Sequence, residues 1–181
     1  MKLLYLLSIM TLFSHLALIT LLFIYILKKE FFKNFLKIFY KYSLFFAFLV
    51  SLVSTIGSLS FSEILKLEPC RLCWFQRIFM YPLVILLGLP LFIKKFRKDF
   101  FVLKKYIILL ALIGSLFSIY HHTLQIFGSF FNQNYICDVN GISCSTAYFQ
   151  FGYITIPLMA LTSFIMIIFI ISVNKRNFKK I

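Results

Sequence analysis

The stretch Pro69–Arg77, PCRLCWFQR, decides the fold, because two cysteines and an arginine stand there at the start of a long apolar run. Proline suits the first turn of a helix, where its missing N–H group has no partner to lose. We therefore predict that Cys70 and Cys73 lie in the first turn of a membrane helix. Cys70, Cys73 and Arg77 are spaced to share one helical face. Arg77 then lies about 6 Å further along the axis than Cys73.

The composition indicates an integral membrane protein. Of the 181 residues, 62% are hydrophobic, and the mean hydropathy is +0.97. Soluble domains of this size do not reach such values. The net charge is +14, which on a soluble chain would suggest a nucleic-acid partner. Here the positive charges are better explained as cytoplasmic residues that orient the helices, so no nucleic-acid partner is expected.

Five apolar runs predict five helices, over residues 3–27, 42–61, 70–93, 106–127 and 151–173. The expected fold is an all-α integral membrane protein, a four-helix transmembrane bundle plus one additional N-terminal transmembrane helix. The first run is too long for a signal peptide and lacks a cleavage site. We therefore divide the chain into an extra helix with its basic loop (1–41), the bundle (42–174) and a basic tail (175–181).

Positive charge predicts the orientation. Fifteen of the 19 Lys and Arg residues fall in three clusters, at 28–41, 94–105 and 175–180. The positive-inside rule places these clusters in the cytoplasm, so we expect a multi-pass protein of the cell (inner) membrane with its N-terminus outside and its C-terminus inside. Both cysteine pairs then face the non-cytoplasmic side, where disulfides form and persist.

The first pair, Cys70 and Cys73, predicts thiol redox chemistry. A helix N-terminus lowers the pKa of a nearby thiol, and Arg71 and Arg77 add positive charge. A lowered pKa makes a thiolate available at neutral pH. The alternatives are a static disulfide or half of a zinc site. Zinc is disfavoured because the cysteines lie in an oxidising compartment, and no metal is expected.

The second pair, Cys137 and Cys144, flanks an Asn140-Gly141 sequence, which is the strongest short signal for a hairpin. A two-residue turn there sets the two cysteines opposite each other, with Cα atoms about 5.5 Å apart, within disulfide range. The loop can therefore close its own disulfide. A purely structural clip on an exposed loop is the alternative.

Arg77 is an arginine within an apolar run, so it needs a partner or a ligand, unless it extends to the outer headgroups. His121 and His122 fall at about the same depth, near the outer end of their predicted helix. Adjacent helical residues do not share a face, so one of them can face the bundle; we favour His121 as the ligand-binding residue. His15 is more simply a packed, hydrogen-bonded histidine.

Together these motifs resemble the disulfide-bond formation protein B (DsbB) family, and most closely its short BdbC-like branch. The resemblance runs from about residue 42 to 173. It is carried by residues 68–77, Met80–Pro82, Tyr120–His122, the loop with the second cysteine pair, and Ile156–Leu158. It implies a four-helix bundle that reoxidises a periplasmic, DsbA-like thioredoxin-fold oxidase and passes the electrons to a membrane quinone, ubiquinone or menaquinone.

The resemblance also implies a role for each site residue. Cys137 would be attacked by the partner oxidase to form a mixed disulfide, which frees Cys144 to attack Cys70. Cys73 would be the thiolate that meets the quinone, and Arg77 would hold the quinone oxygen. This chain departs from the family pattern in its extra first helix and in the short spacing of its second cysteine pair.

Two other interpretations remain open. The vitamin K epoxide reductase family uses similar parts, but it places its loop pair before the CxxC motif, whereas here the CxxC motif comes first. A rival of another class is a non-enzymatic membrane protein with structural disulfides or a metal-handling role.

Overall fold

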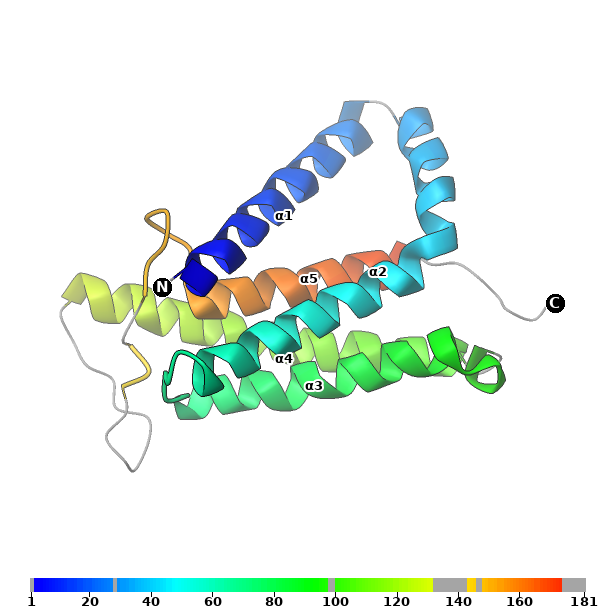
Figure 1. The fold of residues 1–181 in the computed structure, drawn as a ribbon. Helices are drawn as coiled ribbons and strands as arrows, with labels where there is room; N and C mark the ends of the chain where they lie inside the picture. Colours follow the sequence, from blue (N-terminus) through cyan, green and yellow to red (C-terminus); the bar gives the residue numbers. More distant parts are fainter. Residues whose placement is uncertain (1, 28, 98–99, 132–142, 146–147, 174–181) are drawn as a thin grey trace.

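In the computed structural model, five α-helices and one short 3-10 helix make up the described chain (Figure 1). The structure describes residues 2–27, 29–97, 100–131, 143–145 and 148–173. The elements are α1 (Lys2–Leu27), α2 (Lys29–Glu63), α3 (Arg71–Phe92), η1 (Lys94–Arg97), α4 (Phe100–Phe131) and α5 (Ile156–Val173). The predicted all-helical class is confirmed.

Three described segments are long and apolar enough to cross a membrane: Tyr42–Glu63, Arg71–Phe92 and Phe100–Gly128. Shorter apolar stretches occupy Leu4–Thr20 in α1 and Ile156–Ser172 in α5. The helices α2 to α5 pack along one another, so that the start of α3 and the far end of α4 lie at the same end of the bundle (Figure 1).

The core of the bundle consists of large aliphatic and aromatic side chains with little or no exposure, among them Leu83, Leu87, Ile107, Phe164, Ile167 and Ile171. The packing of α4 against α5 depends on Gly114. A Cβ atom built there would overlap the ring of Phe164, which is completely buried. Glycine therefore leaves room for the Phe164 ring between these two helices.

Helix α1 meets the bundle near its own N-terminus and diverges from it toward Leu27 (Figure 1). It contacts α2 and α5. His15 fixes it to the bundle, because Nε2 lies 2.8 Å from the Thr162 hydroxyl and Nδ1 lies 3.2 Å from the Tyr153 hydroxyl. His15 is thus a hydrogen-bonded packing residue, as the sequence predicts.

Helix α2 begins at Lys29, so the loop predicted before residue 42 is wrong for this segment. The sequence explains the difference. Residues 29–41 contain no glycine or proline, and lysines recur every fourth position among Phe, Leu and Ile, which is the repeat of an amphipathic helix. The charges of this segment favour a cytoplasmic loop, but its periodicity predicts the helix that the structure has.

Helix α5 begins at Ile156, whereas the sequence predicted a start at residue 151. Phe151 and Gly152 have φ angles of 50° and 79°, which no α-helix accommodates. The helix starts where Thr155 caps it, with the Leu158 N–H donating to the Thr155 hydroxyl at 3.4 Å. Helix α4 is longer than predicted, because residues 100–105 contain no helix-breaking residue.

Candidate redox site

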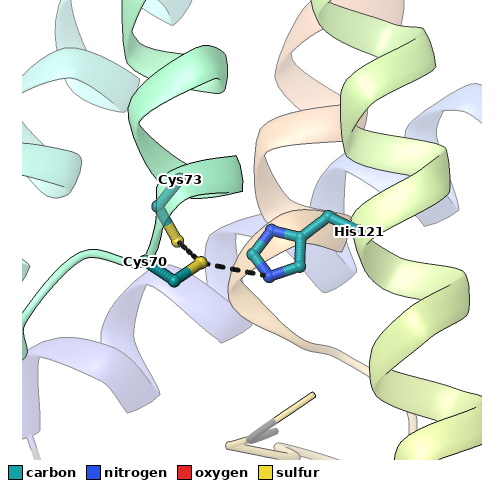
Figure 2. A group of neighbouring side chains, drawn as sticks. All are labelled: Cys70, Cys73 and His121. Carbon is teal, nitrogen blue, oxygen red and sulfur yellow. Dashed lines mark hydrogen bonds between the residues drawn. The ribbon is translucent and has the colours of Figure 1, made fainter. Parts of the chain in front are cut away.

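The first cysteine pair lies at the N-terminus of α3. Cys70 is the N-cap residue, with φ −68° and ψ 169°, and Cys73 lies in the first turn. Both are free thiols, and their sulfur atoms are 3.3 Å apart (Figure 2). Cys70 is buried, whereas Cys73 is partly exposed. The two sulfurs are thus close enough to form and break a disulfide with little movement of the backbone.

His121 extends from α4 toward this pair (Figure 2) and is only 1% exposed. Its Nε2 lies 3.6 Å from the Cys70 sulfur and 3.2 Å from the Cys144 carbonyl oxygen. On the opposite side of the ring, the Gln76 amide nitrogen donates to Nδ1 at 3.0 Å. Because Nδ1 accepts this bond, the hydrogen of the neutral ring belongs on Nε2, which donates toward Cys70 and Cys144.

These contacts determine which sulfur carries the charge. The hydrogen bond between the Cys70 and Cys73 sulfurs, with a smaller contribution from His121, lowers the pKa of Cys70 to about 4, while burial acts in the opposite direction. From the sequence, we expect the helix terminus and the arginines to lower the thiol pKa. In the structure, hydrogen bonds are the larger cause of the lowered pKa of Cys70. In this dithiol arrangement the thiolate is therefore Cys70. The predicted thiolate role of Cys73 concerns a later stage and stays a prediction.

Arg77 lies one turn further along α3 and is only 8% exposed, so its guanidinium is held inside the bundle. Its Nε donates to the Ser58 hydroxyl at 3.0 Å, and its Nη2 donates to the Ser58 carbonyl at 2.8 Å and the Ser62 hydroxyl at 3.2 Å. Its guanidinium carbon also lies 5.4 Å from the centre of the Trp74 ring. Among the described residues, Nη1 has no hydrogen-bond partner and is available to another acceptor.

A cavity of about 500 Å³ opens beside these residues. Its polar end is formed by side chains of α3 and α4, namely Cys70, Cys73, Gln76, Arg77 and His121. Its other walls are mainly apolar and include Val50, Val53, Met80, Met159, Ala160 and Met166. Further polar residues, among them Lys66, Glu68 and Gln125, also line it. A mainly apolar cavity with a limited number of polar groups is typical of sites for small organic ligands and cofactors. The lining is therefore suited to a small organic ligand that carries polar oxygens on an apolar body.

The same cluster also offers ligand atoms for a metal ion. The two thiol sulfurs and the His121 ring nitrogen lie within 4.8 Å of one another. Two thiolates and an imidazole are a donor set that zinc accepts, with a fourth position open.

The second cysteine pair is described only in part. Cys144 is disulfide-bonded and completely buried, and it packs in one apolar cluster with Cys70 and Leu72. Cys137 and the predicted Asn140-Gly141 turn lie outside the described residues. The segment that bears Cys144 thus contacts the N-terminal thiol of α3.

The sequence placed Cys70, Cys73, Arg77 and His121 near one another, and the structure brings all four to this cavity. The neighbouring residue His122 points to Thr155 instead, with its Nδ1 2.9 Å from the Thr155 hydroxyl. Three residues were missed: Gln76, Ser58 and Ser62. Gln76 could have been found, because it is a polar residue in an apolar run and follows Cys73 by three positions, on the same face.

Comparison with known proteins gives consistent matches. The family model described as disulfide bond formation protein DsbB matches residues 40–173. Disulfide bond formation protein C of Bacillus subtilis is 45% identical over 126 residues, which cover 69% of this chain and 86% of that protein.

Two further relatives agree. Probable disulfide formation protein C 1 of Bacillus cereus is 42% identical over 139 residues, 75% of this chain and 95% of the relative. A probable disulfide formation protein of Coxiella burnetii is 39% identical over 141 residues, 75% of this chain and 92% of the relative. No solved structure matches the chain.

Proposed function

Since this chain belongs to the family of disulfide bond formation protein DsbB and is a multi-pass membrane protein-disulfide oxidoreductase, we propose that it reoxidises a DsbA-like thioredoxin-fold oxidase and passes the electrons to a membrane quinone. One observation carries the proposal. His121 Nε2 lies between the Cys70 sulfur, at 3.6 Å, and the Cys144 carbonyl, at 3.2 Å. The two cysteine segments therefore meet beside the cavity.

The orientation is part of the proposal. We place the protein in the cell (inner) membrane, with the N-terminus and both cysteine segments outside and the C-terminus in the cytoplasm. The distribution of Lys and Arg supports this assignment. The contact of Cys144 with Cys70 agrees with it, because it requires both segments to lie on one side of the membrane.

The first half of the reaction is two thiol–disulfide exchanges. A thiolate of the reduced partner attacks Cys137, which forms a mixed disulfide, breaks the Cys137–Cys144 bond and releases Cys144 as a thiolate. Cys144 then attacks Cys70 of an oxidised Cys70–Cys73 pair, and Cys73 leaves as a thiolate. The packing of Cys144 with Cys70 in one buried cluster supports this order.

The second half restores the outer disulfide. The second thiol of the partner attacks its own mixed-disulfide sulfur, leaves with a disulfide and releases Cys137. Cys137 attacks Cys144, re-forms the outer disulfide and releases Cys70. The two electrons now reside on the Cys70–Cys73 dithiol, which is the state that the structure describes.

The remaining step takes place at the cavity, where a bound quinone would accept two electrons from the Cys70 thiolate and the Cys73 thiol, one proton from Cys73 and one proton from water, while the Cys70–Cys73 disulfide forms. Arg77 supports this assignment because it is buried, held by Ser58 and Ser62, and directs Nη1 to no described residue. His121 holds a proton on Nε2 beside the Cys70 sulfur. The residues fit either ubiquinone or menaquinone.

A trapping experiment tests the partner reaction. In the Cys144→Ala variant, the lone Cys137 thiol attacks the oxidised partner but has no neighbour to resolve the product. We expect a mixed disulfide with a soluble thioredoxin-fold protein in cells, detected as an adduct that a reductant cleaves. The control is the Cys137→Ala/Cys144→Ala double variant. The same adduct in that control, or none in the single variant, would contradict the assigned role of Cys137.

A metal-handling role is the second candidate, and the close approach of Cys70, Cys73 and His121 favours it. Titration of the reduced protein with zinc discriminates between the two. A redox site releases zinc to a mild chelator and keeps its quinone reductase activity, whereas a metal-handling site holds the ion and reduces no quinone.

A further inference from the structure

The helix that lies outside the family match contributes to the cavity. The match covers residues 40–173, whereas α1 spans Lys2–Leu27. Even so, four residues of α1 that share one helical face line the same cavity as the redox cysteines: Leu7, Met10, Thr11 and Ser14. In a protein made of the matched residues alone, this side of the cavity would have no such wall.

Specific contacts hold α1 in this position. A Cβ atom built at Gly57 of α2 would lie 3.0 Å from Leu7 Cδ1, so the Leu7 side chain packs tightly onto the space that this glycine leaves. Further along α1, His15 bonds to Thr162 of α5 and to Tyr153. Helix α1 is thus fixed at the two ends of the segment that faces the cavity, at Leu7 and at His15.

The chemistry of this wall is apolar. The Thr11 hydroxyl donates to the Leu7 carbonyl at 2.9 Å, and the Ser14 hydroxyl donates to the Met10 carbonyl at 2.9 Å. Both hydroxyl hydrogens are therefore used within the helix, and α1 directs methyl, methylene and thioether groups toward the cavity. Met10 is 47% exposed and also lines the cavity, so it lies both at the cavity and at the surface of the protein. Methionine adapts its shape to flexible apolar ligands.

We propose that α1 is the wall that binds the isoprenoid tail of the acceptor, and that Met10 is a specificity-determining residue for that tail. The proposal rests on the proposed quinone reductase function. The polar end of the cavity, with Cys73, Arg77 and His121, suits the oxygen-bearing ring of the acceptor. The tail then extends along the apolar walls, and α1 supplies the part of these walls that the family match lacks.

Photolabelling of the full-length protein in proteoliposomes is the direct test. The probe is a decylubiquinone analogue with an aryl azide at the end of its tail. After irradiation, digestion and mass spectrometry, we expect label on the α1 peptide around residues 7–14, and competition by excess decylubiquinone. Competed label confined to α3, α4 and α5 would overturn the proposal. Failure of the reduced protein to reduce the probe would instead overturn the proposed function.

Kinetics of two point variants supply an independent readout. Met10→Ala removes a tail contact, so the KM for decylubiquinone should rise about five- to ten-fold, with kcat and the KM for tail-less duroquinone unchanged. The matched control is Phe13→Ala, because Phe13 is 66% exposed on the same helix and does not line the cavity. An equal change in Phe13→Ala, or an equal rise for duroquinone, would contradict tail binding by α1.

Discussion

The Gln76 amide nitrogen on α3 lies 3.0 Å from Nδ1 of His121 on α4, and this bond fixes the tautomer of the imidazole beside the redox cysteines. Gln76 is 6% exposed and His121 1% exposed, so water does not readily replace either partner. The amide therefore acts through His121 and is a positioning residue.

Replacing Gln76 by Leu should slow the oxidation of the dithiol by quinone. A buried group left without its partner costs about 1–3 kcal/mol, which corresponds to a roughly 5- to 160-fold lower rate. Stopped-flow quinone reduction measures this step. Gln76→Glu is the matched variant, because an ionised carboxylate accepts from Nδ1–H and changes the pH profile of the reaction. A Gln76→Glu variant with an unaltered pH profile would argue against positioning through His121.

The thiolate of Cys70 should persist to acidic pH in the reduced protein. Because its pKa is lowered to about 4, the ultraviolet absorbance of the thiolate should stay constant from neutral pH down to about pH 5 and then fall. The Cys137→Ala/Cys144→Ala background leaves only the α3 pair to be observed. Adding Cys73→Ala removes the main hydrogen-bond donor, so the midpoint should move upward, whereas Cys73→Ser retains a donor and should move it less.

The same pKa shift has a consequence for stability. An unfolded thiol, with a pKa near 9.0, is protonated over the range in which Cys70 is ionised in the folded protein. The amount by which the ionised Cys70 raises the free energy of unfolding is therefore complete above the pKa of the unfolded thiol. It is lost as the pH falls toward about 4. Thermal unfolding of the reduced protein between these values should show a Tm that rises with pH, and this slope should be smaller in Cys70→Ala.

Arg77→Lys should weaken quinone binding more than it slows chemistry. Lysine keeps the charge, but its three N–H donors cannot make all three bonds that Arg77 makes to Ser58 and Ser62 and also present a further N–H group to the cavity. We expect the KM for quinone to rise about ten-fold or more, as the loss of a charged hydrogen bond predicts. Ser62→Ala, which removes only one support of the guanidinium, should change KM by a smaller factor. Steady-state kinetics with decylubiquinone compare the two variants.

Gly114→Ala should destabilise the bundle, because the new Cβ would overlap the ring of Phe164 in the core. Overpacking of this kind costs about 1–3 kcal/mol. Gly152→Ala is the comparison, since nothing lies within 4 Å of a Cβ there and its strain comes only from a φ of 79°. Thermal unfolding in detergent should give the lower Tm for Gly114→Ala; similar Tm values for wild type and Gly114→Ala would contradict the tight contact between α4 and α5.

The sequence predicted the positions of the helices and the location of the first cysteine pair well, because apolar runs and the Pro-Cys-x-x-Cys pattern are local signals. Arg77 and His121 could be placed near that pair from helix length alone. The local pattern failed where two signals competed. For residues 29–41, the basic charge predicted a loop although the periodicity is helical. For Phe151 and Gly152, the apolar composition predicted a helix although both have positive φ angles.

The contacts between helices could not be predicted. That Ser58 holds Arg77, that Gln76 fixes His121 and that α1 lines the cavity all depend on how the helices pack, which no local pattern encodes. Neighbouring small residues of α2 differ in what they do: Gly57 packs against Leu7 of α1, whereas Ser58 bonds Arg77.

The most direct test of the central claim is quinone reduction by the dithiol of α3 alone. The Cys137→Ala/Cys144→Ala protein is reduced, freed of reductant and mixed anaerobically with decylubiquinone, while quinone absorbance and free thiols are followed together. We predict the loss of one quinone and two thiols per protein, and no quinone loss when Cys73 is also replaced by Ser. A stable quinone absorbance with both thiols intact, or equal reduction in the Cys73→Ser protein, would contradict the account.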